Sequence, residues 1–178
     1  MELMDCFKNV RFMHKDDFYM VGLEADIHYN AEDGTSPIAS VWKTWKESKI
    51  EEIIPDQVAP GTCYGLTHSE TADNLAKYMV CVEVSTLANL PTGLVARKFP
   101  ACEYAVFDTT LAIIWTGEFW QAFYTKWLHE SGYALPDSQV KESYPTFNRH
   151  PDIEVYPKDF EGEQSVMHVY APVVKKRV

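Results

Sequence analysis

Two glutamates interrupt otherwise apolar strand patterns, and a carboxylate in such a setting can bind a cation. Glu83 lies in the run from Val80 to Val84, whose other members are valine and cysteine. Glu24 lies in segment 18–29, where apolar and polar residues alternate. An unpaired carboxylate is costly to bury, but it selects for cations because the local dielectric constant is low. Glu83 and Glu24 are therefore candidate ligand-binding residues, and the alternative for each is a solvated sheet face.

Aromatic side chains supply the second part of such a site. They make up 13% of the chain, and a ring face attracts a cation by roughly 0.5–2 kcal/mol. The candidate rings on predicted strands, helix faces and loop edges are Trp42, Tyr64, Tyr104, Phe107, Trp115, Trp120 and Tyr170. The alternative for each is packing in the hydrophobic core, where large rings are common.

Cysteine and histidine spacings match no metal or cofactor site. The four cysteines form no CxxC pair, and the six histidines form no HxH or HxxxH pattern. Neither a phosphate-binding glycine loop nor a GxSxG nucleophile motif is present. We therefore expect no metal, no cofactor and no catalytic residue of these standard types.

The charge of the chain argues against direct binding to nucleic acid. Its formal net charge is −10 and its isoelectric point is about 5.0, whereas nucleic-acid phosphates require a basic protein face. The N-terminal residues do not resemble a signal peptide, and no apolar run is long enough to span a membrane. We expect a cytoplasmic protein with no nucleic-acid or membrane partner.

The first half of the chain predicts a strand, a helix and two further strands. Alternation of apolar and polar residues predicts a strand over 18–29. Further strands are predicted over 62–67 and 78–85, separated by a polar loop. Between the first and second strands, Ser36-Pro37 opens a helix, whose apolar face is formed by Ile38, Val41, Trp42 and Trp45.

The second half repeats this order of elements. Residues 94–99 and 103–108 predict a strand pair, or one strand bent at Pro100. A helix is predicted over 118–131 because its apolar residues recur at spacings of three and four. The later segments are predicted as a short strand over 141–148, an acidic loop over 150–164 and a final strand over 166–174.

These elements predict a single α+β domain spanning residues 1–178. Two strand–helix–strand–strand units, about 10–89 and about 90–175, would form a tandem pseudo-twofold βαββ repeat. Such units can merge into a curved, barrel-like antiparallel sheet with two long helices on its outer face. The central cleft between the halves is the expected ligand pocket.

Several motifs, in this order and spacing, resemble those of the GyrI-like or AraC-type effector-binding domains. They are Leu90-Pro91-Thr92-Gly93, the strand Phe99-Pro100-Ala101-Cys102-Glu103-Tyr104-Ala105-Val106-Phe107, the helix end Glu130-Ser131-Gly132-Tyr133, and the closing Val169-Tyr170-Ala171-Pro172-Val173. Similar matches near the start are Val21-Gly22-Leu23-Glu24 and residues 38–42. The nearest branch is the stand-alone effector-binding proteins associated with integron cassettes.

The resemblance implies a cleft for drugs or other small molecules. In multidrug-sensing relatives the cleft is aromatic, and a buried glutamate meets a cationic ligand. By this resemblance His168 takes the place of the cleft-facing glutamate, and Tyr144 and Phe147 lie at the cleft rim. We expect the protein to bind, sequester or sense a small hydrophobic, cationic molecule without its own DNA-binding domain; a transcription regulator as protein partner is left open.

The resemblance also carries an enzymatic alternative. Some GyrI-like proteins are hydrolases of electrophilic small molecules and use two glutamates, whose places here are taken by Asn148 and His168. We therefore expect no catalysis. The alternative is a hydrolase in which Glu83 or Glu24 acts with His168 as general acid and base. A third interpretation is a module that only binds another protein.

Overall fold

The described residues form one antiparallel sheet of nine strands. The computed structural model describes residues 1–28, 37–69, 75–136 and 150–176. Eight strands follow a continuous path, and the short β7 pairs with β9. The strands are β1 (Arg11–Lys15), β2 (Phe18–His28), β3 (Cys63–His68), β4 (Leu75–Val84), β5 (Val95–Phe99), β6 (Cys102–Thr110), β7 (Tyr133–Ala134), β8 (Asp152–Tyr156) and β9 (Val166–Lys175).

The strand order is that of two repeated halves. The path across the sheet is β1-β6-β9-β8-β3-β4-β2-β5. If each strand of one half is exchanged for its counterpart in the other (β1 for β5, β2 for β6, β3 for β8 and β4 for β9), the same path results, read from the other end. The halves meet where β3 pairs with β8, and Leu66 there lies opposite Ile153. The edge strands are exchanged, since β1 pairs with β6 of the second half and β5 pairs with β2 of the first. The predicted α+β fold with a curved antiparallel sheet is confirmed.

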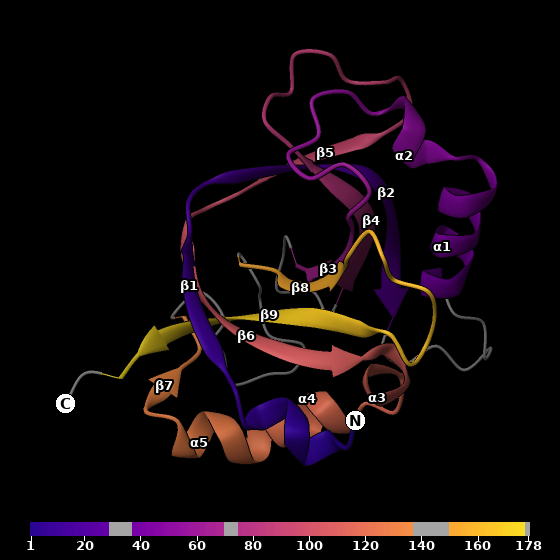
Figure 1. Cartoon of the computed structure of the whole chain (residues 1–178). Helices are drawn as coiled ribbons and strands as arrows, with labels where there is room; N and C mark the ends of the chain where they lie inside the picture. Colours follow the sequence, from indigo (N-terminus) through magenta and orange to yellow (C-terminus); the bar gives the residue numbers. More distant parts are fainter. Residues whose placement is uncertain (29–36, 70–74, 137–149, 177–178) are drawn as a thin grey trace.

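Helices cover the outer face of this sheet, as Figure 1 shows. The first predicted helix is α1 (Pro37–Glu47), which packs on β2 and β4. The second runs through α4 (Glu118–Ala122), the π-helical turn η2 (Phe123–Trp127) and α5 (Leu128–Glu130), and it packs on β6 and β9. Shorter elements are η1 (Leu3–Phe7), α2 (Ile50–Ile53) and α3 (Leu111–Trp115).

Two local predictions differ from the structure, and a third cannot be compared with it. Segment 150–164 was expected to be a loop, but its residues Asp152–Tyr156 form β8. Segments 94–99 and 103–108 are two separate strands, which pair with different halves of the sheet. The strand predicted over 141–148 lies outside the described residues. The error at β8 arose because acidic residues and nearby prolines are typical of loops, whereas strand pairing on both sides overrides that preference.

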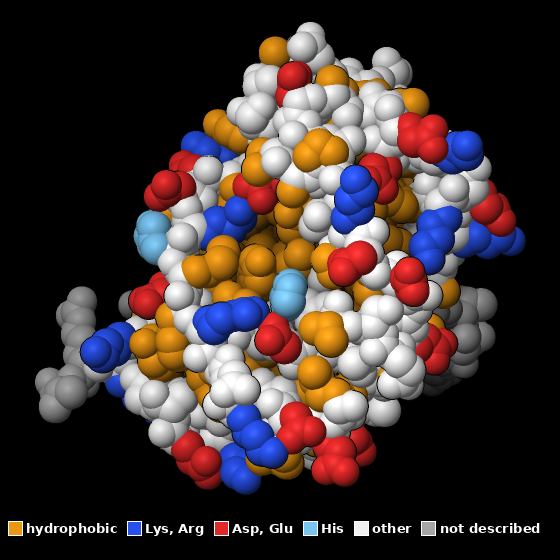
Figure 2. All heavy atoms as spheres, viewed as in Figure 1, with side chains coloured by type: hydrophobic (Ala, Val, Ile, Leu, Met, Phe, Trp, Pro, Cys, Tyr) orange, Lys and Arg blue, Asp and Glu red, His pale blue; other side chains and the backbone are white. Residues whose placement is uncertain are grey.

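The two faces of the sheet have different surroundings. Side chains of the outer face pack against helices, as Tyr78 and Val80 of β4 do beneath α1. Side chains of the inner face, such as Met79 and Cys81, form a separate buried cluster inside the curve of the sheet. In Figure 2 hydrophobic side chains gather in a hollow at the centre of the view, with charged side chains around it. The face that each strand residue occupies therefore decides which environment it enters.

No helix in the described part of the chain is both long enough and apolar enough to cross a membrane.

The aromatic cluster beneath α4 and η2 anchors the second half. Phe107 is fully buried, and its ring centroid lies 5.1–5.8 Å from four others, those of Phe7, Phe119, Phe123 and Trp127. This sequence-predicted ligand-binding ring is thus a core residue.

Phe107→Ala should lower the free energy of unfolding by about 3–5 kcal/mol, because truncation leaves a cavity in a packed core. Urea unfolding monitored by circular dichroism measures the change. Trp115→Ala is the control: Trp115 is 67% exposed, so its loss should change stability by less than about 0.5 kcal/mol. Equal effects of the two substitutions would contradict this description of the core.

Candidate functional site

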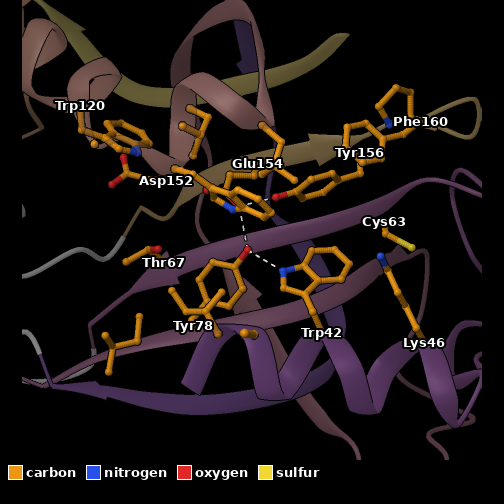
Figure 3. Close-up of a pocket in the computed structure, with 18 of the residues that line it drawn as sticks. Trp42, Lys46, Cys63, Thr67, Tyr78, Trp120, Asp152, Glu154, Tyr156 and Phe160 are labelled. Atoms are coloured by element: carbon orange, nitrogen blue, oxygen red, sulfur yellow. Dashed lines mark hydrogen bonds between the residues drawn. The ribbon is translucent and has the colours of Figure 1, made fainter. Parts of the chain in front are cut away.

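A large cavity lies between the outer face of the sheet and the helices, where the two halves meet. Its volume is about 1170 Å³, which is enough for a drug-sized ligand. Residues of α1, β3, β8, α3 and α4 line it. Its aromatic walls, partly shown in Figure 3, are formed by Trp42, Tyr78, Trp115, Trp120, Tyr124, Tyr156 and Phe160.

Strand β8 brings two carboxyl groups into this cavity. Ile153 and Val155 are buried in the inner-face cluster. Because side chains alternate along a strand, Asp152, Glu154 and Tyr156 point to the opposite face. All three line the cavity. The apolar residues of β8 therefore fix the direction of its acidic residues.

Glu154 is held by hydroxyl groups from two strands. Its Oε2 accepts hydrogen bonds from Tyr78 Oη at 2.7 Å and Tyr156 Oη at 2.8 Å. Trp42 Nε1 donates to Tyr78 Oη at 3.1 Å, and these contacts are drawn in Figure 3. No described residue donates a hydrogen bond to the second oxygen, Oε1. The carboxyl group is thus oriented while one oxygen stays available to a ligand.

Burial sets the protonation of this group. It raises the pKa of Glu154, and the two hydroxyl donors act in the opposite direction. Burial, followed by the nearby Glu154 charge, also raises the pKa of Tyr78 well above its ordinary value. The tyrosine therefore keeps its proton and remains a donor. A cation beside Glu154 would offset the cost of burying its charge.

Gly65 makes this hydrogen-bonded arrangement possible. It lies opposite Glu154 in the pairing of β3 with β8. A Cβ atom at this position would lie 2.8 Å from Glu154 Oε2 and would collide with the Tyr78 hydroxyl. A residue without a side chain is required here because backbone and carboxylate approach closely.

Asp152 adds a second carboxyl group to the same wall. Among the described residues it has no hydrogen bond or ion pair, and it lies near the Trp120 side of the cavity in Figure 3. Burial, followed by the neighbouring Glu154 charge, raises its pKa to about 7. Asp152 therefore titrates in the physiological pH range.

The expectation that Glu83 is unpaired is wrong. Both of its carboxylate oxygens lie 2.8 Å from Lys15 Nζ, and Lys15 also lies over the Phe18 ring at 4.5 Å. Glu83 shares the inner face of β4 with Cys81, so it is directed away from the helix-covered cavity. Sequence reasoning missed Lys15 because it lies on β1, a strand that was not predicted.

Glu24 is also compensated by opposite charge. Its Oε1 lies 2.6 Å from Arg97 Nη2 and 3.3 Å from Lys77 Nζ. Its Oε2 lies 3.1 Å from His68 Nε2. Although burial alone would raise the pKa of Glu24, the hydrogen bonds from His68 and Arg97 hold it well below its ordinary range.

The other predicted residues divide between the two faces. Trp42, Trp115 and Trp120 line the cavity. The tyrosines on the inner face are Tyr64, Tyr104 and Tyr170. Tyr144, Phe147 and Asn148 lie outside the described residues. The residues that sequence reasoning missed are Tyr78, Asp152, Glu154, Tyr156 and Phe160; the alternation Asp-Ile-Glu-Val-Tyr was the signal for three of them.

His168 contacts an acidic residue on the neighbouring strand. Its Nδ1 lies 2.8 Å from Asp108 Oδ1, and Arg11 Nη2 lies 2.7 Å from the same oxygen. The hydrolase alternative required Glu83 or Glu24 as its partner, yet both glutamates are engaged in ion pairs elsewhere. The geometry does not favour that alternative.

The cavity offers little nucleophilic or metal-binding chemistry. Cys63 lines it, but burial, followed by the Glu51 carboxylate 3.0 Å away, raises the pKa of its thiol to about 12. The thiolate needed for nucleophilic attack is therefore disfavoured. Within the described ranges, no three His, Cys, Asp or Glu side chains come together as a metal site.

Comparison with known proteins identifies the family of the chain. A family model described as integron-associated effector binding protein matches residues 11–173. The chain belongs to this family. The resemblance of its motifs to effector-binding proteins is thereby confirmed. No protein with a curated description matches this effector-binding protein significantly.

Several solved structures share the fold of this effector-binding protein. SAV2435 bound to tetraphenylphosphonium has a TM-score of 0.65 and 18% identity, over 93% of this chain and 94% of that one. The Vibrio cholerae integron cassette protein VCH_CASS2 has a TM-score of 0.56 and 13% identity, over 94% and 97%. The EcmrR C-terminal domain has a TM-score of 0.59 and 12% identity, over 94% and 98%.

The pKa of Asp152 should make stability depend on pH. The folded-state pKa of about 7 lies above the ordinary value of 3.8, so the folded state binds the proton more tightly. The contribution of Asp152 to the free energy of unfolding is fully present at low pH and is lost as pH rises from about 4 through about 7. Between pH 5 and 8, the free energy of unfolding of the wild type should fall by about 1–3 kcal/mol relative to that of Asp152→Asn. Urea unfolding at both pH values measures this; a difference that does not change with pH would contradict it.

The role of Gly65 can be tested with a double-mutant cycle. Gly65→Ala should lower the free energy of unfolding by about 1–3 kcal/mol, because the added methyl group displaces the Tyr78 hydroxyl. In a Tyr78→Phe background that hydroxyl is absent, so the same substitution should cost about 1 kcal/mol less. Additive effects in urea unfolding would show that the two residues do not meet.

Proposed function

We propose that this effector-binding protein binds hydrophobic organic cations in the cavity between its two halves, with Glu154 as the carboxylate that meets the positive charge. The observation that carries the proposal is the oriented Glu154 carboxyl group, which keeps one oxygen available inside aromatic walls. The aromatic rings provide dispersion and cation–π attraction. The protein would bind, sequester or sense its ligand and perform no chemistry on it.

The charges around the cavity favour a cation over an anion. Lys43, Lys46 and Lys158 also line it, but all three are exposed. Lys43 lies 3.9 Å from Glu47, and solvent screens such surface charges. The carboxyl groups of β8 are less exposed, so their interaction with a ligand is screened less.

The expected affinity is in the micromolar range. Burying roughly 300 Å² of apolar ligand surface contributes about 7 kcal/mol. Cation–π and charge interactions add about 2–4 kcal/mol, while association costs at least about 4 kcal/mol. The remaining 5–7 kcal/mol or so corresponds to a dissociation constant of roughly 10–200 μM.

The comparisons support this proposal. The family is one of effector-binding proteins. SAV2435, which shares the fold, was solved with tetraphenylphosphonium, a lipophilic monocation. We extend that ligand class to this chain because its cavity combines rings with an available carboxylate.

Glu154→Gln tests the proposal, because it keeps the shape of the side chain and its ability to accept both tyrosine hydrogen bonds. Tetraphenylphosphonium binding, measured by tryptophan quenching, should weaken by about 10- to 100-fold, the scale for losing a charge-assisted contact. The anion tetraphenylborate should bind wild type weakly and gain affinity in the variant.

Glu83→Gln is the matched control and should leave tetraphenylphosphonium affinity within about twofold of wild type, because Glu83 is paired with Lys15 on the other face. The proposal fails if Glu154→Gln binds the cation as wild type does. It also fails if Glu83→Gln causes the larger loss, since the site would then lie on the inner face.

A further inference from the structure

Asp152 has no hydrogen-bond or ion-pair partner among the described residues, although it lies on the same wall as Glu154. We propose that Asp152 forms a second cation subsite, so that the preferred ligand is a compact dication rather than a monocation. This inference rests on the proposed function and specifies its ligand class. It concerns a group that the binding of a monocation at Glu154 does not require.

The geometry of β8 sets the spacing of the two positive centres. Alternate residues of a strand point to the same face and lie about 6.5–7 Å apart. Asp152 and Glu154 are related in this way, and both line the cavity. A ligand with one cationic group at each end of a single aromatic ring has a comparable reach. Longer, flexible dications would have to fold back or leave the cavity.

Aromatic walls are available at both positions. Figure 3 shows Trp120 beside Asp152, whereas Tyr78, Tyr156 and Trp42 surround Glu154. Thr67, the strand partner of Asp152, also lines the cavity. Each carboxyl group therefore has rings beside it that can contact the apolar part of a cationic group.

No base neutralises Asp152 within the described part of the chain. In Figure 3 Lys46 lies near Cys63 at the right of the picture, whereas Asp152 lies at the left. The titratable groups that line the cavity with Asp152 are Lys43, Lys46, Cys63, Tyr78, Tyr124, Glu154, Tyr156 and Lys158. Tyr104 lies on the inner face, but the Asp152 charge contributes to raising its pKa. Of these, the neighbouring Glu154 charge acts with burial in raising the pKa of Asp152 to about 7. A proton occupies this position in part of the molecules at neutral pH.

Binding of a dication should therefore release a proton. A monocation at Glu154 offsets only the Glu154 charge, so burial still raises the pKa of Asp152. A second positive centre beside Asp152 favours its charged form directly. The same linkage requires that preference for the dication increase as pH rises through 7. Proton release that is larger for the dication than for the monocation distinguishes a carboxylate that meets the ligand from one that only shapes the cavity.

The test compares p-xylylenebis(trimethylammonium) with benzyltrimethylammonium, each displacing tetraphenylphosphonium from the full chain. In wild type at pH 8 the dication should bind about tenfold more tightly than the monocation. At pH 5.5, and in Asp152→Asn at either pH, this ratio should fall to about one or two. Asp152→Glu keeps the charge and should keep most of the preference.

Calorimetry in buffers of different ionisation enthalpy supplies the second readout. At pH 7 the dication should release about half a proton from wild type and none from Asp152→Asn. If tetraphenylphosphonium binds but the dication has no advantage, or if Asp152→Asn keeps the advantage, the inference is overturned while the proposed function stands. If tetraphenylphosphonium does not bind wild type, both are overturned.

Discussion

The site depends on one buried carboxyl group and the two tyrosine hydroxyl groups that hold it. A carboxylate in an apolar cavity is unstable unless hydrogen bonds or an opposite charge compensate it. Tyr78 and Tyr156 supply the hydrogen bonds, and both use the same oxygen of Glu154. The hydrogen bonds fix the direction of the group and leave the remaining compensation to a ligand. On the proposed function, the cavity is prepared for positive charge before any ligand enters.

This arrangement also explains why the site lies where the two halves meet. Tyr78 belongs to β4 of the first half and Glu154 to β8 of the second, and β3 lies between them. Gly65 of β3 provides the space through which they make contact. The exchanged edge strands β1 and β5 connect the halves on both outer sides of the sheet. Strand pairing fixes the two halves relative to each other. The Tyr78 hydroxyl and the Glu154 carboxyl group are therefore held within hydrogen-bond distance.

Much of the fold could be predicted from the sequence, but the carboxylate could not. Regular alternation over 18–29 and the apolar helix faces predicted the repeat of elements. Trp42 and Trp120, on the predicted helices, were candidate ligand-binding rings, and both line the cavity. Glu83 was a candidate because it interrupts an apolar run, yet its partner Lys15 comes from a strand of five residues far away in the sequence. Strand β8 is equally short, and its acidic residues are typical of loops. The decisive information is the pairing of β8 with β3 and β9, because only tertiary pairing determines which face Glu154 occupies.

The central claim is that Glu154, on the helix-covered face, meets the positive charge of a ligand. A crystal structure of the protein with tetraphenylphosphonium tests it most directly. We expect the phosphonium centre inside the cavity that Trp42 and Tyr156 line, on the Oε1 side of Glu154, with both tyrosine hydrogen bonds to Oε2 retained. A cation bound on the inner face, beside Glu83 and Lys15, with the cavity of β8 unoccupied, would contradict the account.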